Sequence, residues 1–308
     1  MYGVTNDRRY LSIARTRYDA VRRYFLDAAV PLYSVYVFDD GVHCTQAPHR
    51  FFASVNGNMI WNGLQLARAT GNSRYREEAL ATARAVVANL SDPNGIFTDL
   101  QAENDLEEPL IEAMLVLATA EHRDFARRWL LDNAAAAFSA RRSDGTYGRF
   151  FDGPPPAAVV TAWQTNGGFA AQIAAASLAP AKTVPPAAWN EATLVPDEIT
   201  QLPATIRFSG SGIALIGTIG EVCCQPGHAR IFVDGVETTN QIGTWQNKSS
   251  SGHEFPNSVL FAWRWRTAGR HEIILRPGLY DAKEGGPFIH TRGYDVLGAL
   301  TPMGRSTL

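Results

Sequence analysis

This sequence of 308 residues has few cysteines, no long apolar run and no excess of charge of either sign. No apolar run reaches the roughly 18 residues that span a bilayer. The net charge of −2 gives no electrostatic reason to expect nucleic acid or an anionic membrane as a partner. The start, MYGVTNDRRYLSIA, lacks the apolar region of a secretory signal.

The cysteines Cys44, Cys223 and Cys224 show no metal-binding spacing, and the histidines show none either, so no metal or cofactor is expected. All three cysteines are inert buried thiols in one interpretation. In the other, the adjacent pair forms a strained vicinal disulfide or one of its members bonds elsewhere.

The apolar fraction of 45% supports packed cores, and the length fits two domains of ordinary size. Hydrophobic periodicity changes from 3.6 to 2 across a proline-containing stretch. The sequence therefore predicts a helical domain over residues 1–178, a linker over 179–188, a β domain over 189–298 and a tail over 299–308.

The helical domain is organised around a helical hairpin at Ser54–Tyr75. Its first helix carries apolar residues at helical spacing and ends at Gly71, a residue that tolerates the left-handed conformation. Asn72 or Ser73 then caps the second helix. Further helices are expected over residues 7–29, with Asp7 as N-cap, and over 107–120, 121–139 and 158–178. Stacked hairpins of this kind suggest a toroid or solenoid.

The β domain shows short alternating segments separated by glycine and Asp-Gly turn signals. Strands are expected at Thr205–Phe208, Ile213–Ile216, Ala229–Val233, Val259–Trp265, His271–Leu275 and 287–294, with a hairpin at Asp234-Gly235. The expected architecture is multidomain, α then β: helical hairpins followed by an antiparallel, jelly-roll-like β-sandwich.

Motifs in the helical domain stand in an order that resembles the C-terminal half of glycoside hydrolase family 76, the α-1,6-mannanases. The residues that carry the resemblance are Asp40-Gly41, Cys44, Asn56, Gly63-Leu64, Thr70-Gly71-Asn72, Tyr75, Ala79, Asn89-Leu90-Ser91-Asp92, Asn94-Gly95-Ile96 and Arg142-Ser143-Asp144-Gly145. The resemblance implies a partial (α/α)-toroid that binds α-mannan in a cleft at the helix ends. It also implies a secreted protein, either extracellular or in the cell wall.

This chain departs from that family where its catalytic Asp-Asp pair would stand, because no Asp-Asp-x-x-Trp helix is present. Two other carboxylate pairs are candidates for catalysis, since a glycosidase needs one protonated and one ionised acid. Asp39 and Asp40 lie in an aromatic loop, where a turn or cap role is the alternative. Glu108 and Glu112 share a helix face, where a solvated acidic face is the alternative.

Candidate sugar-binding residues lie in both domains. On the central hairpin they are Asn56, Asn58 and Trp61, the last with a core position as its alternative. The β domain resembles the galactose-binding-like modules of secreted glycosidases through Ile206-x-Phe208-x-Gly210-x-Gly212-Ile213-x-Leu215-x-Gly217, Val233-Asp234-Gly235 and Gly269-x-His271-x-Ile273. Aromatic faces with amide or cationic donors suit sugars. The candidates there are Trp245, Asn247, Lys248, Trp263, Trp265, His290, Arg292 and Tyr294, with a core role open for Trp263 and Trp265.

Three hypotheses follow. The first is a family-76-like hydrolase that acts on or binds α-mannan, with its catalytic pair absent or altered. The second is a non-catalytic carbohydrate-binding protein, and the third is a truncated gene product. Because half a toroid exposes apolar helix faces, a partner, self-association or closure by the β domain is expected.

Overall fold

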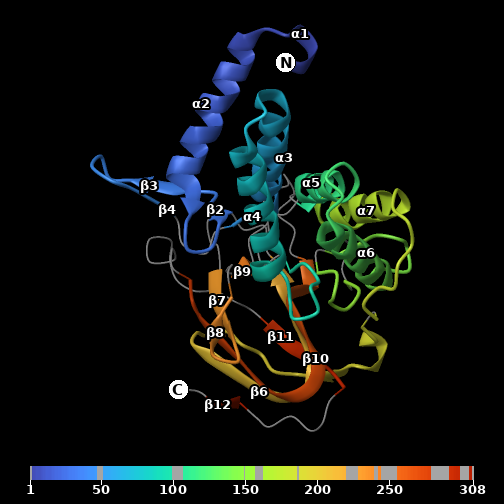
Figure 1. Ribbon diagram of the computed structural model, residues 1–308. Helices are drawn as coiled ribbons and strands as arrows, with labels where there is room; N and C mark the ends of the chain where they lie inside the picture. The colour runs from blue at the N-terminus through green and yellow to red at the C-terminus, as the bar shows by residue number, and fades with distance from the viewer. Residues whose placement is uncertain are drawn as a thin grey trace.

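The computed structural model describes residues 2–46, 51–98, 107–148, 150–156, 162–185, 187–219, 228–238, 242–243, 255–278, 291–298 and 305–306. We call residues 2–178 the helical half and residues 189–306 the sheet half. Figure 1 shows the helices gathered at one end of the molecule and the sheet at the other. None of the described helices combines the length and apolar character needed to cross a membrane.

The helices of the helical half follow the sequence prediction closely. They are α1 (Tyr2–Thr5), α2 (Arg8–Phe25), α3 (Ala53–Thr70), α4 (Ser73–Asn89), α5 (Glu107–Thr119), α6 (Asp124–Ser139) and α7 (Ala162–Ala176). Asp7 caps α2 by accepting a hydrogen bond from Arg9 N. Gly71 ends α3 with a φ of 70°, and Asn72 caps α4. The α3–α4 hairpin is confirmed, whereas the partial (α/α)-toroid stays a prediction.

The core of the helical half lies between α3, α4, α5, α6 and α7. Its fully buried side chains include Ile60, Leu64, Leu110, Met114 and Leu130. By contrast, α2 lies at the edge of the molecule, and Tyr18 is its one buried residue. Two short hairpins follow α2, formed by β1 (Leu26–Asp27) with β2 (Leu32–Tyr33) and by β3 (Val37–Asp39) with β4 (Cys44–Gln46).

The sheet half contains one eight-stranded antiparallel sheet, preceded by the short 3₁₀ helix η1 (Trp189–Glu191). The strands along the main path are ordered β5 (Thr193–Val195), β11 (Thr291–Leu297), β6 (Ala204–Ile219), β10 (Phe255–Pro277), β7 (His228–Val233) and β8 (Val236–Glu237). Off this path, β12 (Arg305–Ser306) pairs with β6 and β9 (Ile242–Gly243) with β7. The two-sheet sandwich stays a prediction.

Two strands are much longer than the sequence predicts. The expected pair of strands at 205–208 and 213–216 is one continuous β6, and the pair at 259–265 and 271–275 is one β10. The sequence predicts turns at the glycines between these segments. The structure gives Gly210 another role, because a Cβ at this position would lie only 2.8 Å from Leu297 O. Gly210 therefore permits close packing of β6 against the end of β11, and the strand continues.

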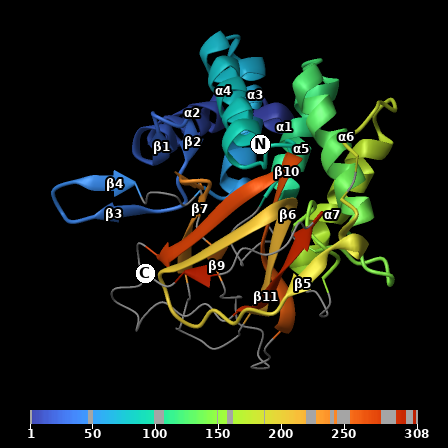
Figure 2. The ribbon, with the colours of Figure 1, turned by 90° about the horizontal axis from the view of Figure 1, so that it is seen from below.

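The long strands bend, and the bend faces the helical half. The pairing of β10 with β6 shifts register between Arg264 and Gly269. Figure 2 shows this part of β10 next to the helices. Within this bend Arg266 Nε donates to Pro93 O over 2.8 Å, and Arg264 pairs with Asp152. The two halves are thus joined by hydrogen bonds as well as by packing.

Candidate functional site

The Asp39-Asp40 pair forms the turn of the β3–β4 hairpin. Asp39 Oδ1 accepts from Gly41 N, and Asp40 Oδ1 accepts from the backbone N–H groups of Val42 and His43 at 2.8 and 2.7 Å. Backbone hydrogen bonds from His43 and Val42 lower the pKa of Asp40. Both carboxylates are exposed. This geometry favours the turn role, since a catalytic acid needs a raised pKa.

The three candidates on α3 differ in their positions. Asn56 is 0% exposed, and its amide bonds the backbone N–H and C=O of Tyr33 and the C=O of Phe52. In this structure Asn56 ties the chain after α2 to the start of α3, and it does not face solvent. Asn58 is exposed and Trp61 is 39% exposed, one helical turn apart on the outer face of α3.

The acidic pair on α5 is also at the surface. Glu108 Oε2 accepts a 2.6 Å hydrogen bond from Asn166 Nδ2 on α7, and Glu112 is exposed one turn later. Nothing in these contacts separates the two carboxylates into a protonated and an ionised group. Their catalytic role stays a prediction.

The candidates in the sheet half are only partly described. Trp245, Asn247, Lys248 and His290 lie outside the described residues, as do Cys223 and Cys224. Arg292 is exposed on β11 and donates to Asn257 Oδ1 over 3.4 Å. Tyr294 is buried in the core of the sheet half. In the part of the chain that the structure describes, no group of three or more His, Cys, Asp or Glu could hold a metal ion.

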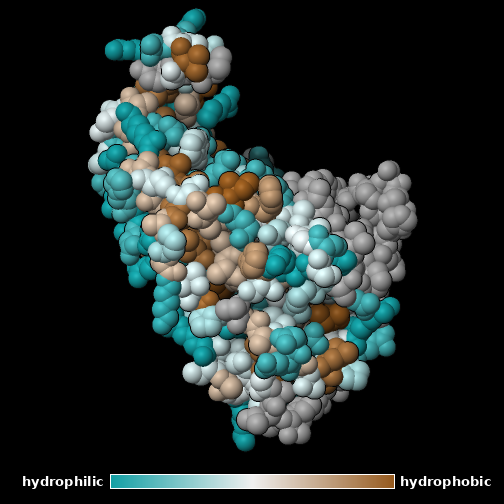
Figure 3. Space-filling view, turned by 90° about the vertical axis from the view of Figure 1, so that its right-hand side faces the viewer, coloured by the Kyte–Doolittle hydropathy of each residue, from teal (hydrophilic) through white to brown (hydrophobic). Residues whose placement is uncertain are grey.

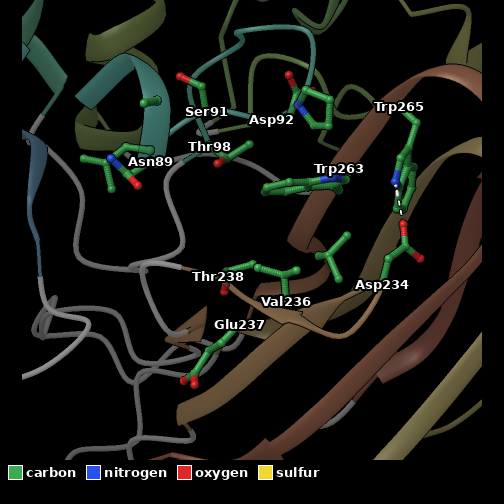
Figure 4. Close-up of a pocket in the computed structure, with 14 residues that line it drawn as sticks. Asn89, Ser91, Asp92, Thr98, Asp234, Val236, Glu237, Thr238, Trp263 and Trp265 are labelled. Atoms are coloured by element: carbon green, nitrogen blue, oxygen red, sulfur yellow. Dashed lines mark hydrogen bonds between the residues drawn. The ribbon is translucent and has the colours of Figure 1, made fainter. Parts of the chain in front are cut away.

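A cavity of about 440 Å³ lies between the two halves (Figure 4). The helical half lines it through the end of α4 and the loop after it, and the sheet half through β7, β8 and β10. The lining residues are Ala88, Asn89, Leu90, Ser91, Asp92, Pro93 and Thr98 from the first, and Val233, Asp234, Val236, Glu237, Thr238, Trp263 and Trp265 from the second. We call it the junction cavity.

Two tryptophans of β10 give the junction cavity an aromatic wall. Trp263 extends into the cavity between the 89–98 loop and β8, as Figure 4 shows. The Trp263 ring stacks on Phe261 with an interplanar angle of 18°, and its buried Nε1 has no hydrogen-bond partner among the described residues. An indole donor without a partner is costly unless a ligand or water accepts its hydrogen bond.

Trp265 is held in place by its neighbours. Its Nε1 donates to Asp234 Oδ2 over 2.9 Å, and its ring stacks on His271 at 3.8 Å between centroids. Asp234 Oδ2 also bonds His271 Nδ1, while Asp234 Oδ1 accepts from Glu272 N. The aromatic wall is therefore preorganised, and a carboxylate lies beside it.

Two buried carboxyl groups lie at the side of the cavity that the helical half forms, and one of them, Asp92, lines it. Asp92 and Asp152 are 5% and 3% exposed, and each has one oxygen with no hydrogen-bond partner among the described atoms. Burial and the neighbouring Asp152 charge raise the pKa of Asp92 well above its usual range. Burial also raises the pKa of Asp152, while the Arg264 guanidinium at 2.5 Å opposes that effect. Both pKa shifts favour the protonated form of these buried carboxyls over the ionised form.

Solved structures resemble this chain in fold, although no protein-family model and no curated protein sequence matches it. The α-1,6-mannanase GH76A of Salegentibacter sp. HEL1_6, as an inactive variant in complex with α-1,6-mannotetrose, matches with a TM-score of 0.52 and 21% identity. The match covers 57% of this chain and 54% of that chain. The matched part has a GH76-like fold.

A second structure agrees. The Lin0763 protein from Listeria innocua matches with a TM-score of 0.52 and 19% identity, over 57% of this chain and 51% of that chain. This chain therefore spans about half the length of these two neighbours.

Sequence reasoning identified part of the junction cavity. It placed Trp263 and Trp265 on one strand face and left open whether that face was core or sugar site. Asp92 opens a turn in the loop after α4, since its Oδ1 accepts from the N–H groups of Asn94 and Ile96. No local signal linked Asp92 to Asp152 or Arg264, because these residues meet only in the tertiary fold.

Proposed function

We propose that this protein binds an α-mannan-type polysaccharide without cleaving it, and that the junction cavity holds the sugar. The observation that carries the proposal is Trp263, a half-buried ring whose Nε1 has no partner among the described residues, in a cavity that also offers hydroxyl, amide and carboxylate groups. The volume lies within the range of about 300 to 1,000 Å³ that is typical of ligand pockets.

The chemistry of the lining suits a neutral ring bearing many hydroxyl groups. A tryptophan face can cover the apolar face of a pyranose, because the indole offers a large, rigid apolar surface. Asn89, Ser91 and Thr98 can donate to or accept from hydroxyl groups, and the Asp234 carboxylate can accept from them. The mannotetrose bound in a protein of similar fold supports the choice of α-mannan among polysaccharides.

Isothermal titration with α-1,6-linked manno-oligosaccharides tests this proposal. We expect Trp263→Ala to weaken binding by about tenfold, the equivalent of about 1.4 kcal/mol. Trp61→Ala is the matched control, because Trp61 is an exposed tryptophan of the helical half outside the cavity. If Trp263→Ala bound the sugar as the wild type does and Trp61→Ala lost binding, the site would lie on α3 instead of in the junction cavity. Binding that survives Trp245→Ala would count against the 245–248 loop, and no binding by the wild type would refute the proposal.

Hydrolysis of α-1,6-mannan is the second candidate function, favoured by the GH76-like fold. Asp39, Asp40, Glu108 and Glu112 are the residues proposed for it. Incubation with α-1,6-mannan and measurement of new reducing ends decides between the two, since a binding protein releases none. Either function fits an extracellular or cell-wall location.

A further inference from the structure

We propose that the groove between α2 and α3 docks an amphipathic helix of a partner protein whose apolar stripe is flanked by Asp or Glu. This inference goes beyond the proposed function, because the groove contains no residue of the junction cavity. The groove has a volume of about 750 Å³ and runs along the outer edge of the helical half.

The apolar residues of α2 explain why the groove needs an occupant. Tyr10, Ile13, Ala14 and Val21 recur at the spacing of one helical face and line the groove together with Met59 and Leu66 of α3. Ile13 is 57% exposed, and Tyr18 is the one buried residue in all 18 of α2. In Figure 1 the N-terminal end of α2 projects beyond the other helices, and Figure 3 shows hydrophobic atoms on this projecting end.

The shape of the groove selects a helix. The open stripe from Tyr10 to Val21 is about 16 Å long at 1.5 Å per residue, which matches about three turns of a docked helix. Two neighbouring helices whose apolar residues recur every three to four positions present ridges into which a third helix packs.

The charges around the groove select an acidic partner. Among its lining residues Arg17 and Arg68 are cationic and none is acidic, and Arg68 also lies 3.7 Å from Glu121 outside the lining. The helix α2 carries six arginines and one aspartate, and no acidic partner contacts Arg15 or Arg17 in the described part of the chain. Carboxylates flanking the stripe of an incoming helix would pair with these cations.

The same charges argue against a second copy of this chain. A two-fold symmetric interface that packs α2 on its own copy would bring the Arg17 side chain of each groove next to that of the other copy, and these like charges repel. The self-association expected from the sequence is therefore the competing outcome of the test.

Fluorescence polarisation on the full chain tests the proposal with two designed peptides. Both are 18-residue amphipathic helices with the same leucine stripe, one flanked by Glu and the other by Lys. We expect the Glu peptide to bind more tightly, with an affinity that falls as NaCl rises. Ile13→Asp should weaken it by about tenfold, since a central apolar contact is lost.

Charge reversal makes the test specific. The double variant Arg17→Glu, Arg68→Glu should prefer the Lys peptide, whereas Arg15→Glu, the same change on α2 outside the groove lining, should not. Equal binding of the two peptides, or none by either, would overturn the proposal. So would a wild-type dimer in analytical ultracentrifugation that Ile13→Asp dissociates, because the occupant would then be a second copy.

Discussion

Replacing Arg264 by methionine tests the junction between the two halves most directly. The Arg264 and Asp152 side chains are 13% and 3% exposed, and their atoms Nη1 and Oδ1 are 2.5 Å apart. Methionine keeps an unbranched apolar stem but removes the guanidinium charge, so Asp152 stays buried beside Asp92 without its cation. Breaking a buried pair in this way costs about 3–5 kcal/mol.

The size of this loss should depend on pH. Without Arg264 the pKa of Asp152 in the folded variant rises further above the unfolded carboxyl pKa of about 4. Below pH 4 the variant therefore keeps its stability, and it loses stability as the pH rises from there through the pKa of Asp152 in the folded state. We expect Arg264→Met to lower the melting temperature by about 10 °C at pH 7 and by much less near pH 4.

Differential scanning calorimetry across that pH range measures both effects. Arg266→Met is the matched control, because Arg266 lies two residues along β10 and makes one hydrogen bond, to Pro93 O, from an exposed position. It should cost only about 1 kcal/mol, at every pH. The buried-pair reasoning would be refuted if Arg264→Met lost as little stability as the control. It would also be refuted if Arg264→Met lost the same stability at pH 4 and at pH 7.

Three further predictions concern stability. Asp92→Asn puts a neutral amide where the wild type has a carboxyl of raised pKa. In urea unfolding, the stability of the wild type should therefore fall more steeply from pH 4 to pH 8 than that of the variant, which keeps Asp152. Gly57→Ala would place a Cβ against the backbone nitrogen of Leu110, and thermal unfolding should show a loss of about 1–3 kcal/mol as α3 and α5 separate. Asn56→Leu leaves the buried backbone groups of Tyr33 unpaired, and should cost about 1–3 kcal/mol in denaturant titration. Loss of mannan binding in Asn56→Leu at unchanged stability would instead favour the sugar contact expected from the sequence.

The helices could be read from the sequence because their signals are local. Asp7, Gly71 and Asn72 mark helix ends through hydrogen bonds and backbone angles that involve only their near neighbours. The ends of α2 differ from the prediction by a few residues, since the chain after Phe25 pairs as β1 instead of continuing the helix.

The strands and the junction were harder to predict because their causes are distant in sequence. Gly210 resembles a turn residue locally, yet its reason is the carbonyl of Leu297 on another strand. Trp263 could be placed on a face of β10, but whether that face meets solvent, core or cavity depends on the loop after α4. The ion pair between Arg264 and Asp152 joins residues that are 112 positions apart in the sequence.

The long strands also set a time order for assembly on the ribosome. Residues Ala204–Ile219 of β6 acquire their β10 partners only when the chain has been made as far as Leu275. At about 5–20 residues per second, the segment from the end of α7 to that point takes roughly 5–20 s to synthesise. During this interval the helices have emerged, whereas Asp152 lacks its arginine and faces water. The helical half is thus expected to pass through a nascent state that is more open at the junction than the finished protein.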